Sequence, residues 1–194
     1  MNKVTEKNTE VTFADGTNDG EAVPKRWIAT LVQMNCEKQV SNKLAKLGYD
    51  TYIPTQKEIH DWSDRRKRID RIIIPMVVFV KATFAEESFL RNQSFVYKLL
   101  AFPGTEEARK GFATPIPNDQ IDRLKFMLDN AYSEVTIQND IEVGDDVCVI
   151  SGPLRGLEGM VSEIDEKTSM VAVRLNGLGY ACVRIDRMII KFKY

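Results

Sequence analysis

Along residues 26–130 the spacing of hydrophobic residues alternates between the two-residue period of a strand and the longer period of a helix. Short, mostly apolar runs predict strands at residues 26–33, 49–53 and 95–102. Capping residues followed by apolar residues at intervals of three and four predict helices after Asn35, Thr83 and Asn118. This alternation is typical of one compact domain in which helices pack on a sheet.

A run of nine uncharged residues, 72–80, lies between Arg71 and Lys81 and is rich in isoleucine and valine. A run this short and β-branched predicts a strand. Both of its faces are apolar, so it is either covered on both sides within the fold or used for docking on one side. Pro75 lacks a backbone donor, which predicts a bulge or a sheet edge at that point.

The segment before this strand, residues 57–70, is polar and is expected to form a hairpin with it. It contains the one concentrated basic run of the chain, Arg65, Arg66, Lys67 and Arg68. The net charge of the whole chain is −1, so bulk charge predicts no affinity for nucleic acid. A run of like charges is most often a solvated surface.

The hydrophobic pattern changes after residue 130. Residues 131–142 have no clear periodicity and are interpreted as a linker. Glycines then separate four short β-type segments, residues 147–150, 159–164, 170–175 and 181–185. Their spacing of about ten residues predicts a small antiparallel β-barrel over residues 143–194. At the other end of the chain, residues 1–25 are polar and predict a disordered tail.

The residues that usually carry chemistry are sparse. The three cysteines, Cys36, Cys148 and Cys182, are widely spaced, and His60 is the sole histidine. This argues for a cytoplasmic protein without a disulfide framework or a metal site. No phosphate-binding glycine loop and no apolar run long enough to span a membrane are present. We therefore expect no cofactor, no membrane contact and no enzymatic activity.

Residues 144–161 resemble a KOW motif, in which a G-D-x-V strand is followed by a G-P-x-x-G-x-x-G turn and an apolar strand. Gly152 and Pro153 would turn the chain, and Gly156 can take a positive φ. Gly159 would let two barrel backbones approach closely. Barrels with this motif occur in ribosomal proteins and in the NusG family of transcription elongation factors.

The first domain resembles the NusG N-terminal domain. The shared features are Trp27 in the first strand, a following helix, the basic hairpin, the Ile74-Pro75-x-Val77-x-Phe79-Val80 strand and the Pro115–Asp119 helix entry. The resemblance covers residues 26–194. It implies an α+β fold, with an NGN-like α/β sandwich of antiparallel or mixed sheet over residues 26–130 and a KOW, SH3-like barrel over residues 143–194.

The resemblance also implies partners. In this family the first domain binds the clamp helices of the RNA polymerase β′ subunit, and the barrel recruits the termination factor Rho or a ribosomal protein. The implied polymerase-binding residues are Trp27, Pro75, Val77 and Phe79. The implied contacts with upstream or non-template DNA are Arg65, Arg66, Lys67 and Arg68. The other side of the strand, Ile74, Met76, Val78 and Val80, is assigned to the core.

Three features differ from many family members. Val77 replaces an aromatic residue, Met76 replaces a glycine or asparagine, and residues 176–179 replace a Phe-Gly loop. The chain therefore resembles specialised members such as RfaH or the UpxY-type regulators of capsular polysaccharide operons. This implies an antitermination factor for one long operon, expected to encode a surface polysaccharide. The alternatives are a ribosome- or RNA-binding KOW protein, or a general NusG that couples transcription to Rho and translation.

Overall fold

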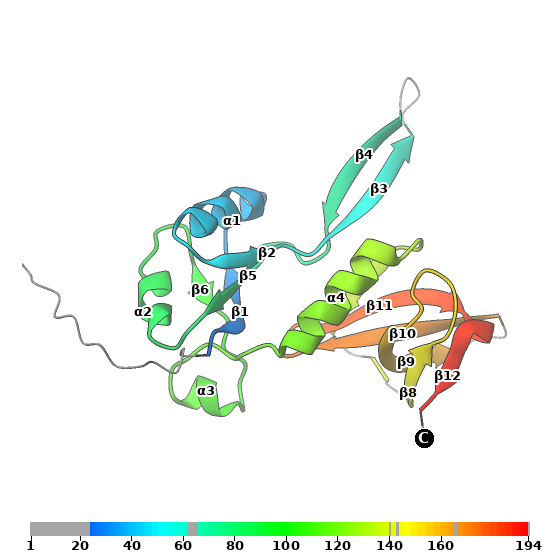
Figure 1. The fold of residues 1–194 in the computed structure, drawn as a ribbon. Helices are drawn as coiled ribbons and strands as arrows, with labels where there is room; N and C mark the ends of the chain where they lie inside the picture. Colours follow the sequence, from blue (N-terminus) through cyan, green and yellow to red (C-terminus); the bar gives the residue numbers. More distant parts are fainter. Residues whose placement is uncertain (1–23, 62–65, 140, 143, 165–166, 194) are drawn as a thin grey trace, which may run out of the picture.

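The computed structural model describes residues 24–61, 66–139, 141–142, 144–164 and 167–193. The predicted tail lies outside the described residues except for Pro24 and Lys25, and so does Arg65 of the basic run. The described chain forms an N-terminal sheet with flanking helices, a projecting hairpin and a C-terminal barrel (Figure 1). The α+β architecture predicted from the sequence is confirmed.

The N-terminal sheet has the strand order β2-β5-β1-β6. Its strands are β1 (Arg26–Leu31), β2 (Asp50–Tyr52), β5 (Val77–Ala82) and β6 (Lys98–Leu99). The central strands β1 and β5 are antiparallel, with Ile28 opposite Val80. The predicted strand at residues 95–102 is confirmed only as the short edge strand β6.

Helices cover both faces of this sheet. They are α1 (Glu37–Lys46), α2 (Glu86–Arg91) and α4 (Asn118–Asn130), while the short helix α3 (Glu106–Arg109) buries no residue. Side chains of α1 and α2 pack against Ile28, Val78 and Val80 on one face. Side chains of α4 pack in the cluster that contains Val77 and Phe79 on the other. Short helix α3 was not expected from the sequence.

Local capping explains where several of these helices begin and end. The predicted capping box is confirmed: the backbone N–H of Thr83 donates to Glu86 Oε2 at 2.8 Å, and the N–H of Glu86 donates to Thr83 Oγ1 at 3.3 Å. Gly48 follows α1 with a φ of +88°. The predicted cap at Asn35 is wrong, because Cys36 occupies the N-cap and Asn35 itself has a φ of +63°.

The predicted strand over residues 72–80 is interrupted. Strand β4 (Arg66–Ile72) ends at Ile72, and β5 begins at Val77. Met76 between them has a φ of +63°, a left-handed conformation that breaks an extended run. The hairpin therefore forms between β3 (Thr55–Asp61) and β4, not with β5, and it projects away from the rest of the molecule (Figure 1).

The barrel sheet has the strand order β12-β8-β9-β10-β11-β7, with antiparallel neighbours throughout. Its strands are β7 (Val135–Gln138), β8 (Asp146–Val149), β9 (Glu158–Ile164), β10 (Thr168–Leu175), β11 (Gly179–Asp186) and β12 (Ile190–Phe192). A short 3-10 helix, η1 (Arg187–Ile189), precedes β12. The predicted barrel strands are confirmed. The interpretation of residues 131–142 as a linker is wrong in part, because β7 pairs with β11.

Helix α4 lies between the N-terminal sheet and the barrel (Figure 1). One hydrophobic cluster continues from Trp27 and Phe79 of the sheet, through Leu124 of α4, to Val173 and Leu175 of the barrel. The two folded parts therefore share a core in this structure. No helix in the described part of the chain has the length and apolar character needed to cross a membrane.

Candidate functional site

The candidate docking face is the side of the N-terminal sheet formed by Trp27, Ala29, Val77 and Phe79. These residues belong to one hydrophobic cluster, which includes three of the four residues implied to bind polymerase, Trp27, Val77 and Phe79. The expectation that Val77 and Phe79 face a partner is wrong for this structure, because they are only 4% and 0% exposed. Pro75, in contrast, is exposed on the turn that precedes β5.

Neighbouring elements explain this burial. The ring of Tyr52 on β2 stacks against Phe79, with centroids 6.0 Å apart. The backbone N–H of Ile116 donates to the Trp27 carbonyl at 2.8 Å, which holds the entry to α4 against β1. Burial, aided by the negative charge of Asp129, raises the pKa of Tyr52 well above its ordinary value. The phenol is therefore neutral and serves as packing.

The turn before β5 also changes which residues share a face. Val78 and Val80 pack in the core beneath α1 and α2, as assigned from the sequence. Ile74 instead joins the cluster of Val77 and Phe79. Strict alternation fails because the turn interrupts the strand. The N–H of Met76 donates to the buried carboxylate of Glu37 at 2.8 Å, which fixes the turn that exposes Pro75.

Helix α4 contacts the docking face and the barrel with different side chains. Lys125 lies over the rings of Trp27 and Tyr52, 5.1 Å from each centroid. Gln120 and Arg123 lie on another side of the helix and reach the barrel. The guanidinium of Arg123 is 3.5 Å from Glu158 of β9. Helix α4 therefore packs against both the docking face and the barrel.

The loop at residues 176–179 also contacts the N-terminal part. The Asn176 N–H donates to Gln120 Oε1 at 2.8 Å, and Gln120 Nε2 donates to Asn176 Oδ1 at 3.1 Å. A Cβ placed on Gly177 would lie 1.9 Å from Cδ2 of Phe102. Sequence reasoning found the unusual loop but missed Gln120 and Phe102, because no local pattern marks a contact between distant segments.

The glycines of the KOW motif have the geometry expected of them. Gly152 and Gly156 have φ values of +78° and +90°. A Cβ on Gly159 would lie 2.7 Å from the carbonyl oxygen of Ala172, so the strands β9 and β10 require glycine there. Pro153 follows Gly152 in the turn and lines a small pocket together with buried Leu154.

The basic run lies on the distal half of the projecting hairpin. Arg66, Lys67 and Arg68 are on β4, opposite Asp61, His60 and Ile59 of β3. Arg65 lies outside the described residues. Nearer the body of the molecule, Arg71 forms an ion pair with Glu58 across the hairpin. The run is thus separated along the hairpin from the docking face.

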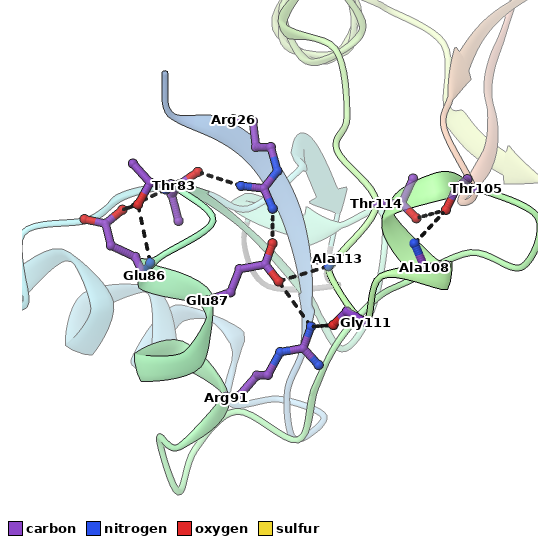
Figure 2. Close-up of polar contacts among 11 residues, drawn as sticks. Arg26, Thr83, Glu86, Glu87, Arg91, Thr105, Ala108, Gly111, Ala113 and Thr114 are labelled. Atoms are coloured by element: carbon purple, nitrogen blue, oxygen red, sulfur yellow. Dashed lines mark hydrogen bonds and ion pairs between the residues drawn. The ribbon is translucent and has the colours of Figure 1, made fainter. Parts of the chain in front are cut away.

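A buried ionic network fixes the start of β1 next to Trp27 (Figure 2). Glu87 is 1% exposed and forms an ion pair with Arg26, and its other oxygen is 3.1 Å from Arg91 Nη2. The Ala113 N–H donates to Glu87 Oε2 at 3.0 Å. Burial lowers the pKa of Arg26, and the charge of Glu87 opposes that shift. The network joins β1, α2 and the segment that leads to α4.

Among the described side chains, no group of three or more histidine, cysteine, aspartate or glutamate residues is placed to hold a metal ion. The arrangement combines a buried apolar face, an exposed turn at Pro75 and a projecting basic hairpin.

Comparison with known proteins gives consistent matches. Residues 25–125 match the family described as "Transcription termination factor nusG", and residues 143–175 match the KOW motif. The chain is 27% identical over 172 residues to the transcription termination/antitermination protein NusG of Staphylococcus carnosus, covering 82% of this chain and 90% of that protein. It is 24% identical over 172 residues to the Synechocystis protein of the same description, covering 79% and 82%.

Among solved structures, one titled "Domain interaction in Thermotoga maritima NusG" is similar to this chain. The match has a TM-score of 0.49 and 20% sequence identity, and covers 88% of this chain and 98% of that one.

Proposed function

Because the chain belongs to the NusG family of transcription termination and antitermination factors, we propose that its N-terminal domain binds RNA polymerase at the clamp helices of the β′ subunit. The observation that carries this proposal is the apolar docking face that ends in the exposed Pro75 turn. Pro75 is the direct contact. Trp27, Val77 and Phe79 support the turn from within, since their burial holds β1, β5 and α4 together.

The basic hairpin has a separate role. Arg65, Arg66, Lys67 and Arg68 contact the phosphates of upstream or non-template DNA while the Pro75 turn contacts polymerase. Two features support this role: the hairpin projects from the body of the molecule (Figure 1), and its basic run lies toward the far end. Phosphate contacts of this kind weaken steeply as salt rises.

The barrel recruits a further partner, Rho or a ribosomal protein, when it separates from α4. In this structure residues 176–179 contact Gln120 and Phe102, and Leu154 and Leu157 are buried in the shared cluster. A partner that uses these residues has to displace those contacts. We therefore take the closed arrangement as the resting form.

The protein acts on one long operon, expected to encode a surface polysaccharide. The support is the divergent loop at residues 176–179, which is engaged by the protein's own N-terminal part. Two experiments test the proposal. Purified protein should raise the yield of full-length transcript from a long template with purified polymerase.

In a deletion strain, transcript profiling should show loss of the distal genes of one operon. A uniform change across the genome would instead indicate a general factor. Binding to ribosomes with no effect on purified polymerase would favour an RNA-binding KOW protein.

A further inference from the structure

The Pro75 turn between β4 and β5 has a shape that its own sequence does not favour. Pro75 is followed by Met76 with a φ of +63°, which is the order of a type II turn. Glycine or asparagine is usual after the proline of such a turn, because most other side chains are strained at a positive φ. Methionine favours the type I turn, in which the same residue has a negative φ. A contact from outside the turn is therefore needed to select its type.

Glu37 provides this contact. It is the first residue of α1, it is 2% exposed, and its Oε1 accepts from the Met76 N–H at 2.8 Å. Its Oε2 has no hydrogen-bond partner among the described residues. Burial of a carboxylate with one oxygen unpaired is costly, although the start of a helix favours negative charge. The hydrogen bond from Met76 compensates this buried charge and forms only while Met76 is left-handed.

The backbone is anchored on both sides of the turn. The Ile73 N–H donates to the Pro54 carbonyl at 2.8 Å, and the Val32 N–H donates to the Met76 carbonyl at 2.8 Å. The peptide unit that joins Pro75 to Met76 lies between these two anchors. Rotation of that unit by about half a turn converts a type II turn into a type I turn and reverses the direction of its N–H. Of these three contacts, the hydrogen bond to Glu37 is the one that opposes this rotation.

The same hydrogen bond sets the direction of the Pro75 carbonyl. The described chain has no cis peptide bond, so the N–H and C=O of each peptide unit point in opposite directions. Because the Met76 N–H points inward to Glu37, the Pro75 carbonyl points away from it. None of the described residues donates a hydrogen bond to this carbonyl, and Pro75 is exposed. The turn thus presents a backbone acceptor beside the proline ring.

We propose that the Pro75 carbonyl is the polar contact of the Pro75 turn with polymerase, and that Glu37 is its positioning residue. The carbonyl accepts from a side-chain donor of the partner, because the backbone donors of a helical partner are used within its helices. Rotation of the peptide unit turns the carbonyl inward, so this hydrogen bond is lost. The inference rests on the proposed binding of the Pro75 turn to the clamp helices, and it names the chemistry of that contact.

Three variants separate positioning of the turn from a general loss of folding. Glu37→Ala removes the acceptor, so the peptide unit rotates and Met76 relaxes to a negative φ. Glu37→Gln keeps a carbonyl oxygen that can accept the same hydrogen bond. Met76→Gly removes the strain, so the turn keeps its type with or without the carboxylate. Glu87→Ala is the matched control, since it also removes a buried carboxylate of this domain but one that pairs with Arg26 and Arg91.

Amide hydrogen exchange, followed by NMR on the full chain, reports the turn itself. The amide of residue 76 should exchange slowly in the wild type and in Glu37→Gln, and about tenfold faster or more in Glu37→Ala. Affinity for purified core polymerase reports docking. Glu37→Ala should weaken binding about tenfold alone, but about twofold or less when combined with Met76→Gly. Any loss caused by Glu87→Ala should be the same with and without Met76→Gly.

The carbonyl contact is measured by the carbon-13 shift of the Pro75 carbonyl. A carbonyl that accepts a hydrogen bond moves downfield, so this signal should move downfield when a polymerase fragment that carries the clamp helices is added to the full chain. The same addition to Glu37→Ala should move it much less, because the carbonyl then points inward.

Four results would overturn the proposal: equal exchange of residue 76 in the wild type and Glu37→Ala, Glu37→Gln binding as weakly as Glu37→Ala, an effect of Glu37→Ala that Met76→Gly leaves unchanged, or no downfield shift of the Pro75 carbonyl in the saturated complex. Each of these results is obtained with a wild type that binds polymerase. A wild type that does not bind polymerase would overturn the proposed function, and this inference with it.

Discussion

The ring of Phe102 occupies the space into which a side chain at Gly177 would extend. A Cβ on Gly177 would lie 1.9 Å from Cδ2 and 2.0 Å from Cγ of that ring. The two residues belong to the N-terminal part and the barrel, so their contact depends on the closed arrangement. A side chain at position 177 is incompatible with that arrangement unless Phe102 moves.

Gly177→Ala should therefore open the molecule. Gly156→Ala is the matched control, because Gly156 also has a positive φ but has no atom within 4 Å of an added Cβ. In both variants backbone strain should lower the free energy of unfolding by roughly 1–2 kcal/mol. Small-angle scattering should show a larger radius of gyration for Gly177→Ala alone. Equal radii for the two variants would show that Phe102 yields and that the contact does not control closure.

Glu87 should be important for stability. Replacing it by Ala leaves the partly buried guanidinium of Arg26 without its ion-pair partner, which is expected to cost about 3 kcal/mol, the lower end for a buried pair. Glu106→Ala is the control, since its carboxylate is 80% exposed and its pairing with Lys110 contributes less than about 1 kcal/mol. Urea unfolding followed by circular dichroism measures both. A small decrease in the free energy of unfolding for Glu87→Ala would mean that water replaces the carboxylate.

The capping box at α2 should make stability depend on pH. The backbone N–H of Thr83 holds the pKa of Glu86 below its ordinary value of 4.5, and the Thr83 hydroxyl adds to this effect. A lowered pKa in the folded state contributes stability that is complete above the unfolded pKa and is lost as pH falls through the folded pKa. The difference in unfolding free energy between wild type and Glu86→Gln should therefore be present at pH 7 and shrink below pH 4.5. A difference that is constant with pH would contradict the capping role.

The cysteines should differ in reactivity. Cys182 is buried on β11, and burial raises its pKa to about 11, so little thiolate forms at neutral pH. Cys36 and Cys148 are partly exposed. Iodoacetamide followed by peptide mass spectrometry should modify Cys36 and Cys148 well before Cys182. Equal rates under native conditions would show that the barrel opens on the labelling timescale.

The features that the sequence predicted correctly depend on local geometry. The capping box of Thr83 and Glu86 and the turn glycines 152 and 156 act within a few residues, so their types reveal their roles. The fold class and the barrel strands followed from hydrophobic period and from the KOW resemblance.

The features that the sequence missed depend on distant partners. Nothing local indicates that Val135 pairs with Val183, because a short polar segment becomes a strand only when an open sheet edge is available. The division of residues 74–80 into two faces is correct for Val78 and Val80 but wrong for Ile74, because the left-handed Met76 interrupts the alternation. Burial of Val77 and Phe79 depends on α4, which the sequence predicted as a helix without indicating the face it covers.

The central claim is that the Pro75 turn contacts RNA polymerase. The most direct measurement is the affinity of the full chain for purified core polymerase, compared among wild type, Pro75→Asp and Pro103→Asp. Both prolines are exposed in turns of the N-terminal part, so the two variants carry the same chemical change. We predict that Pro75→Asp weakens binding about tenfold or more, as expected for a charge buried in an apolar contact, while Pro103→Asp binds like the wild type. Equal binding by all three proteins would contradict the assignment.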